Sequence, residues 1–272
     1  MDHGTFEIRI MTARAIWKGS LKVGTTSIAV KLYAAVQEHD IRFHILQGAT
    51  KSRVKQKIVT EEHKAVEKEN IRKGYEIEPG RFVIVEPKEI EQFKPKESRT
   101  VSFPRFVPIS ELPNEWYERP YYVGPDGDPQ NYFALAEALD KRRELGIARW
   151  SMRGTSYVGA LRVHDEYLTL IKLRYAEEVR SLSELEAPAG RKLHQKELHM
   201  AEQLVQALEG DFKPEEFRDE YRDRLAEFIE AKAKGKHPRL PKITARRARG
   251  SLEQQLAKSL AAMKRGKGKK VA

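Results

Sequence analysis

The chain contains no cysteine, which excludes disulfides, thiol catalysis and cysteine-ligated zinc. No run of 18 or more apolar residues occurs, so a membrane-spanning helix is not expected. The segment from Met1 to Thr12 has no long apolar stretch and does not resemble a secretory signal. These absences favour a cytoplasmic protein. With 272 residues and a hydrophobic fraction of 40%, the chain can still bury a sizeable core.

Sequence signatures of enzymes are also missing. The chain has no GxxxxGK[ST], GxSxG, HExxH or GxGxxG motif. Its eight histidines include no pair three or four residues apart, the spacing that places two ligands on one helix face. We therefore expect no catalytic residue, no metal site and no cofactor.

Positive charge is concentrated at the C-terminal end. The formal net charge is +11, but residues 231–272 contain fourteen Lys or Arg and a single acid, giving +13. The rest of the chain carries a net charge of −2. A near-neutral body followed by a basic tail is typical of proteins that contact nucleic acid or anionic lipid. A merely solvated tail is the plain alternative.

Short β-rich runs with turns every eight to twelve residues fill the first two thirds of the chain, a pattern that predicts a barrel or sandwich. A hairpin is expected around Pro79-Gly80, and a short helix over 87–93. A helix is expected over 130–145, ending at Gly146. The expected strands are two within 14–36, then 41–46, 51–59, 75–86 as the hairpin, 99–107, 120–124, 147–153, 156–164 and 166–173.

The pattern changes to helical periodicity near residue 176, so the fold class is α+β. Helices are predicted over 195–209 and 214–233, the second beginning at Pro214 and followed by Gly235. A capping box at Ser251 and an apolar stripe predict one more amphipathic helix over 251–265. The stripe consists of Leu252, Leu256, Leu260 and Met263.

A run of alternating cations is the first candidate DNA-binding feature. If residues 51–59 form a strand, Lys51, Arg53, Lys55 and Lys57 lie on one face. Alternate residues of a strand are roughly 6.6–6.8 Å apart, close to the phosphate spacing along one DNA strand. The face could therefore track a duplex without reading bases. The alternative is an exposed strand whose lysines prevent edge-to-edge aggregation.

The tail offers two further candidates. Its cations would contact phosphates without sequence preference. Its amphipathic helix is marginal alone, so the stripe needs burial, either back on the body or in a partner's groove. The tail cations are Arg246, Arg247, Arg249, Lys264, Arg265, Lys267, Lys269 and Lys270.

Several segments, in order and in register, resemble bacterial Ku, the DNA-end-binding protein of non-homologous end joining. The resemblance extends over nearly the whole chain from Thr12. It is carried by residues 13–20 (ARAIWKGS), 28–33 (IAVKLY), 73–76 (KGYE), 106–108 (FVP), 119–122 (RPYY), 173–180 (LRYAEEVR), 214–221 (PEEFRDEY) and 229–232 (IEAK).

The resemblance implies a Ku-type β-barrel core with a C-terminal helical arm, two copies of which form a ring that threads onto a broken duplex end. It also implies a non-catalytic role, in which the leucine-bearing segment Ser251 to Lys264 recruits the ATP-dependent DNA ligase D. We accordingly expect an N-terminal extension at 1–11, the barrel at 12–180, linker and arm at 181–235, and the basic tail at 236–272. The extension precedes Met11-Thr12-Ala13, which resembles a usual family start.

One segment departs from the family. Many relatives carry cysteines in the region that reads VTEEHKAV here, from Val59 to Val66, so a metal or redox role is unsupported. Three rivals to end binding stay open: a general coat protein of double-stranded DNA, an enzyme acting on nucleic acid, and a scaffold whose tail binds a partner.

Overall fold

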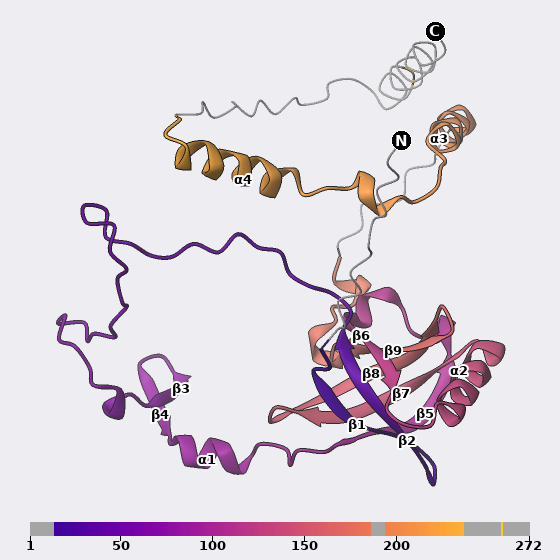
Figure 1. Cartoon of the computed structure of the whole chain (residues 1–272), viewed down its shortest axis with the longest axis horizontal. Coiled ribbons are helices and arrows are strands. Elements are labelled where there is room, and N and C mark those ends of the chain that lie inside the picture. Colours follow the sequence, from indigo (N-terminus) through magenta and orange to yellow (C-terminus); the bar gives the residue numbers. More distant parts are fainter. Residues whose placement is uncertain (1–13, 186–193, 237–256, 258–272) are drawn as a thin grey trace, which may run out of the picture. The chain divides into compact units, whose positions relative to one another are not determined.

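A computed structural model describes residues 14–185, 194–236 and 257 (Figure 1). The contacts divide it into two units. The first extends through Leu182 and contains a β-barrel, and the second contains the chain from Ser183 together with Asp40–Phe43. The expected domain boundaries stay a prediction. Most of the tail, including its cations and its leucine stripe, lies outside the described residues, as does the expected extension at 1–11.

Seven strands close into a barrel in the order β1-β2-β6-β9-β8-β7-β5. Every neighbouring pair is antiparallel except β1 and β5, which pair in parallel and close the barrel. The strands are β1 (Trp17–Val23), β2 (Thr26–Ala34), β5 (Thr100–Pro108), β6 (Tyr117–Pro125), β7 (Glu144–Met152), β8 (Thr155–His164) and β9 (Tyr167–Leu173). The β-barrel within an α+β fold is therefore confirmed.

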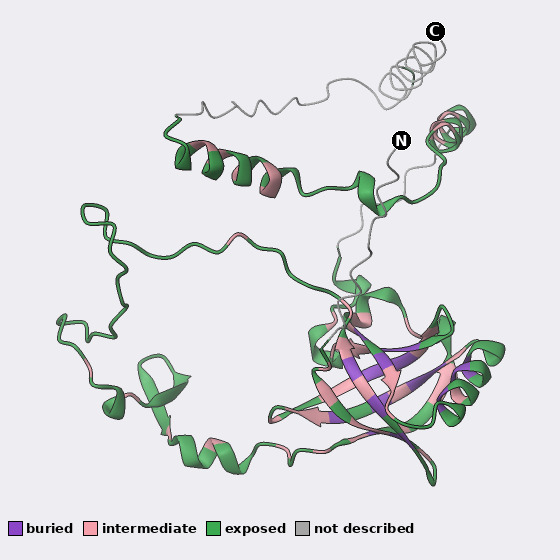
Figure 2. Ribbon diagram, in the orientation of Figure 1, coloured by how far each residue is buried: buried purple, intermediate pink, exposed green. Residues whose placement is uncertain are grey.

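The core lies inside this barrel, where the inward residues of each strand are apolar (Figure 2). Leu21, Val30, Leu32, Val101 and Leu161 are almost completely buried. Strand alternation explains the pattern, because every second side chain points inward and the intervening ones face outward. The alternation that the sequence shows in these runs therefore corresponds to a real inner and outer face.

Helix α2 (Gln130–Arg142) packs against β7, β8 and β9. It ends at Arg143 in a left-handed conformation, three residues before the expected stop at Gly146. Tyr132 is completely buried and fixes the helix to the barrel. Its hydroxyl donates to the Val123 carbonyl at 2.5 Å and accepts from the Leu168 amide at 2.8 Å.

Between β2 and β5 the chain makes a long excursion outside the barrel sheet (Figure 1). The excursion contains the expected hairpin, β3 (Lys73–Glu78) and β4 (Arg81–Val85), and helix α1 (Pro87–Gln92). Gly80 has φ +78° at the hairpin turn, a conformation that favours glycine.

The strands expected at 41–46 and 51–59 do not form. Only two isolated bridges occur there, Leu46 with Arg53 and Val59 with Ala65. The β-like alternation is present in the sequence, but no neighbouring strand completes a ladder, and a strand without partners is not stable.

The second unit contains α3 (Gln195–Ala207) and α4 (Glu220–Ala233). The expected start of the second helix at Pro214 is wrong, because Pro214–Glu216 forms a separate 3₁₀ turn. Helix α4 begins after Asp219, whose carboxylate accepts from the Arg222 amide at 3.0 Å. The capping side chain, rather than the proline, therefore fixes the start of the helix.

The remaining short elements are 3₁₀ turns, at Lys68–Asn70, Ile109–Glu111, Asn114–Trp116, Ala176–Glu178 and Leu182–Glu184. In the described ranges, no helix has the length and apolar character needed to cross a bilayer.

Candidate nucleic-acid interface

The predicted cations Lys51, Arg53, Lys55 and Lys57 lie on the excursion, and all four are exposed. Lys51 lies in a turn closed by two hydrogen bonds, and the other three follow the turn. The Lys51 amide donates to the Gln47 carbonyl at 2.8 Å, and the Gln47 amide donates to the Ser52 carbonyl at 2.9 Å. Lys51 has φ +55° in this turn. Since no strand forms, the regular one-sided stripe that the spacing predicted is absent.

The segment is strongly cationic although it forms no strand. Residues 41–58 contain five Lys or Arg and no Asp or Glu. None of the four predicted cations forms an ion pair with another described residue. From 61 to 99, by contrast, nine Lys or Arg are matched by ten acids. The first part of the excursion is therefore a locally uncompensated cationic segment, suited to phosphates.

Sequence reasoning missed a second group of cations, on the barrel. Two adjoining hollows of about 770 and 430 Å³ share Ser98 and Ser151. Arg149 lines the larger hollow, and Arg99 and Arg153 line the smaller one. These three side chains are exposed, and none forms an ion pair within the described part of the chain.

Hydrogen-bond donors surround these arginines. The hydroxyl-bearing residues Thr100, Ser102 and Ser156 line the larger hollow. So does Trp150, which is 4% exposed and whose Nε1 has no hydrogen-bond partner among the described residues. Arginine guanidinium groups and hydroxyls are the donors that most often contact phosphate and sugar oxygens. The alternation of Arg149, Ser151 and Arg153 could have suggested this surface, but the hollow requires β5 and β8 beside β7.

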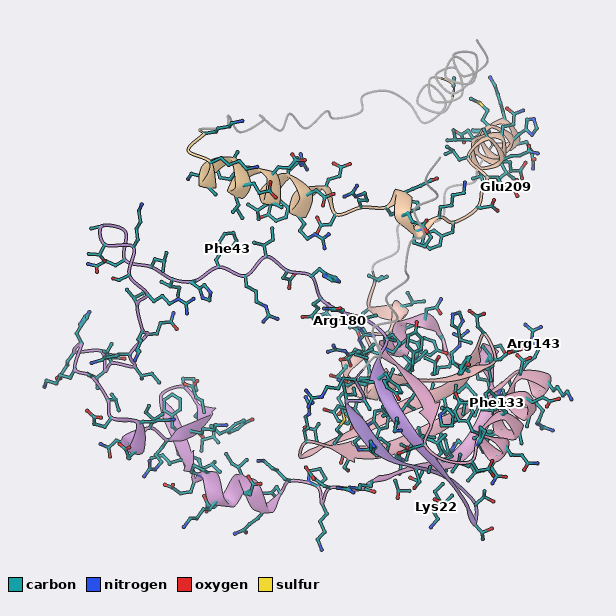
Figure 3. All side chains as sticks on the ribbon, viewed as in Figure 1. Lys22, Phe43, Phe133, Arg143, Arg180 and Glu209 are labelled. Atoms are coloured by element: carbon teal, nitrogen blue, oxygen red, sulfur yellow. The ribbon has the colours of Figure 1, made fainter. Side chains whose placement is uncertain are left out.

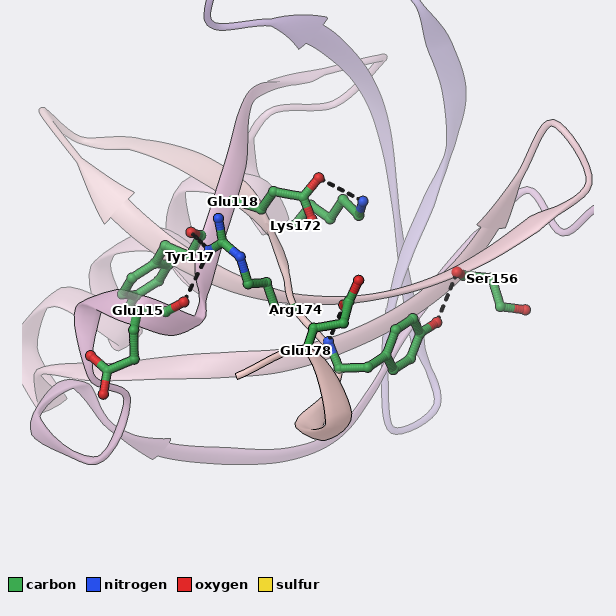
Figure 4. A network of polar contacts seen from close by, with 8 residues as sticks. Glu115, Tyr117, Glu118, Ser156, Lys172, Arg174 and Glu178 are labelled. Carbon is green, nitrogen blue, oxygen red and sulfur yellow. Dashed lines mark hydrogen bonds and ion pairs between the residues drawn. The ribbon is translucent and has the colours of Figure 1, made fainter. Parts of the chain in front are cut away.

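Some other barrel cations are bonded to protein acceptors. Arg174 donates from Nη1 to the carbonyls of Glu115, at 2.9 Å, and Tyr117 (Figure 4). Lys172 bonds Glu118 at 2.7 Å, and this hydrogen bond raises the pKa of Lys172 above its usual value. Beside Arg174, the Tyr175 hydroxyl donates to the Ser156 carbonyl at 2.9 Å, and the Tyr175 amide donates to Glu178 at 2.7 Å. This network fixes the end of β9 and is structural.

Lys31 also forms an ion pair within the protein. Its ammonium lies 2.6 Å from Asp126, whereas Lys18 lies 3.9 Å from the same carboxylate. The hydrogen bond raises the pKa of Lys31 and lowers that of Asp126. Arg99, Arg149 and Arg153 are thus cations without an ion pair among the described residues, and they lie together at the two hollows around Ser98 and Ser151. No cluster of three metal-binding side chains occurs in the ranges that the structure describes.

Comparison with known proteins identifies relatives of the whole barrel. Residues 22–200 match the family model described as the Ku70/Ku80 beta-barrel domain. The chain is 39% identical over 257 residues to the "Non-homologous end joining protein Ku" of Anaeromyxobacter sp. (strain K), covering 93% of this chain and 87% of that protein. It is 36% identical over 226 residues to the protein of the same name from Archaeoglobus fulgidus, covering 82% of this chain and 89% of the relative.

Proposed function

Because this chain belongs to the Ku family, we propose that it binds the ends of double-stranded DNA in non-homologous end joining. The observation that carries the proposal is the match over residues 22–200, together with relatives named for that pathway. The resemblance that the segments from Ala13 to Lys232 show in sequence is consistent with this family.

The binding contacts we propose are of two kinds. The cationic segment 41–58 and the arginines at the barrel hollows would bind phosphate and sugar, which every duplex presents alike. A protein that accepts any broken end needs contacts of this kind, because base contacts would restrict it to particular sequences. Their affinity would fall steeply with salt, because each neutralised phosphate releases counterions.

We further propose that two copies form the ring. The helices of the second unit support this, because they expose apolar side chains that the described chain does not cover. These are Leu198 and Val205 on α3, Leu208 directly after it, and Tyr221 and Ile229 on α4. Isolated helices with exposed apolar faces gain stability by packing on another copy, and a two-fold dimer is the commonest arrangement. Recruitment of ligase D through residues 251–264 completes the proposal, with a role that is non-catalytic.

End binding is tested with two duplexes of equal length, one with open ends and one with both ends closed by bulky blocks. Affinity is measured for both at several salt concentrations. We expect tight binding to the open duplex and weak binding to the blocked one, because a ring must thread over an end. Equal affinity would contradict threading and favour the alternative, a general coat protein of double-stranded DNA.

A further inference from the structure

A different part of the barrel carries two hollows of the opposite character. One, of about 680 Å³, is lined by Tyr33, Tyr122 and Tyr167 with His164 and Asp165. The other, of about 560 Å³, is lined by Phe133 of α2 and by four carboxylates, again including Asp165. Both hollows border the turn between β8 and β9, so they form one acidic and aromatic surface. Phe133 is labelled in Figure 3.

The strand register builds the aromatic part. Tyr33 of β2 is directly opposite Tyr122 of β6, and both face outward because Leu32 and Val123 beside them are buried. Gly124 forms the floor between them. A Cβ at Gly124 would lie 3.1 Å from the Tyr33 ring, so a side chain there would begin to fill the hollow.

The aromatic walls are both accessible and anchored. Tyr122 is 49% exposed and Tyr167 is 52% exposed. The Tyr167 ring contacts Phe133 edge to face, with centroids 6.0 Å apart, and Phe133 in turn contacts the buried Tyr132 ring at 5.1 Å. Because Tyr132 is hydrogen-bonded to two strands, the surface is preformed, which lowers the entropy cost of binding.

The charge of the surface selects a cationic ligand. Glu137, Asp140, Asp165 and Glu166 line the two hollows, and the lining includes no Lys or Arg. Glu137 is bonded to Lys141 at 2.6 Å. Asp140 and Glu166 have no cationic partner among the described residues. Such a surface would repel the phosphates of nucleic acid, although its rings could otherwise stack on bases.

We propose that this surface binds a lysine- or arginine-bearing segment of a partner protein. The cationic head would lie against the tyrosine rings, whose faces attract cations, with the Asp165 carboxylate beside it. The aliphatic stem of the same side chain would contact the rings and Gly124. The inference is independent of end binding, because it uses none of the residues assigned to DNA.

The probe is a peptide of glycine and three lysines, acetylated at its N-terminus and amidated at its C-terminus. It is titrated into the full chain, and binding is measured by calorimetry. Two matched peptides carry trimethyl-lysine and uncharged norleucine in place of lysine. We expect the two cationic peptides to bind and the norleucine peptide not to bind, because a cation–π contact requires the charge. Equal binding of the norleucine peptide would overturn the proposal, and so would no binding of any peptide.

Variants locate the site. Tyr122→Leu and Tyr167→Leu should each weaken binding of the lysine peptide about 2- to 30-fold. Asp165→Asn should also weaken it, whereas Tyr122→Phe, which keeps the ring, should leave it nearly unchanged. Tyr75→Leu is the matched control, because Tyr75 is 70% exposed on the separate β3–β4 hairpin. The proposal fails if Tyr122→Leu, Tyr167→Leu and Asp165→Asn bind the lysine peptide as tightly as the Tyr75→Leu control does. It also fails if these variants keep their affinity for the peptide and lose affinity for single-stranded DNA overhangs.

Discussion

At the scale of single residues, Tyr132 is the clearest determinant of how helix α2 packs on the barrel. Its one hydroxyl forms hydrogen bonds with two strands. The hydroxyl satisfies the Val123 carbonyl and the Leu168 amide, both on buried backbone. Burial raises the pKa of Tyr132, so the phenol stays neutral and remains a donor. Helical periodicity indicated that 130–145 is a helix, but not which residue would fix it to the barrel.

Replacing Tyr132 with phenylalanine should therefore destabilise the barrel. The change leaves a buried amide and a buried carbonyl without this partner, at a cost of about 1–3 kcal/mol. The measurement is the urea unfolding midpoint of the purified chain. Tyr122→Phe is the control, because the exposed Tyr122 side chain forms no hydrogen bond with another described residue, so its midpoint should not move. Equal midpoints for the two variants would show that the Tyr132 bonds contribute little.

At the scale of elements, the excursion shows where a local pattern is insufficient. Barrel strands such as β8 and β9 were predicted within one or two residues, because their alternation coincides with a real inner face. Residues 51–59 alternate as well, yet only Arg53 and Val59 form isolated bridges. Alternation shows that a strand would have one apolar face to bury. A β-ladder also requires a neighbouring strand, and the local sequence does not show whether one lies beside it.

The cations of the excursion still predict a measurable effect. Changing Lys51, Arg53, Lys55 and Lys57 together to alanine should weaken binding to all duplex sequences alike. It should also lower the slope of log affinity against log salt by up to about 3 to 4 units, because each lost phosphate contact contributes about 0.9. The measurement is a salt titration of duplex binding by fluorescence anisotropy.

A charge-matched control lies in the same excursion. Lys68, Lys73, Lys88 and Lys96 are exposed and are interspersed with acids, so their replacement removes the same charge without removing a cationic cluster. The slope of this variant should stay near that of the unchanged protein. Identical slopes for the two quadruple variants would show that residues 51–57 are not part of the DNA interface.

The same salt titration on the variants Arg149→Ala and Arg153→Ala tests whether the barrel hollows bind DNA.

At the scale of the whole molecule, positive and negative charges lie in separate regions. Residues 41–58 and one pair of barrel hollows carry cations without an ion pair among the described residues, and the other pair of hollows carries acids and tyrosines. Residues 231–272 add a net charge of +13 to a nearly neutral remainder. Under the two proposals, this segregation would keep the DNA contacts apart from the surface that binds a protein partner.

Deleting residues 250–272 should separate two of the proposed roles. We expect the shortened protein to lose stimulation of ligase D while retaining part of its end binding, because the barrel and the excursion remain. The measurement is ligation of linear duplexes by the purified ligase with each form. Changing Leu252, Leu256 and Leu260 to alanine in the full chain keeps the tail charge and should have the same effect on ligation. Stimulation that survives in both forms would contradict recruitment through this segment.

The amino-acid sequence pointed to the family through segments that resemble bacterial Ku. It also predicted the α+β class, most barrel strands and the basic tail, because alternation, turn residues and charge are local properties of the chain. Tertiary structure decided the rest. Whether residues 51–59 become a strand depends on a neighbour, and Arg149 acquires its hollow only beside β5 and β8. Tyr33, Tyr122 and Tyr167 meet because strands remote in sequence pair in one register around a closed barrel, and that register is set by which faces the whole fold can bury.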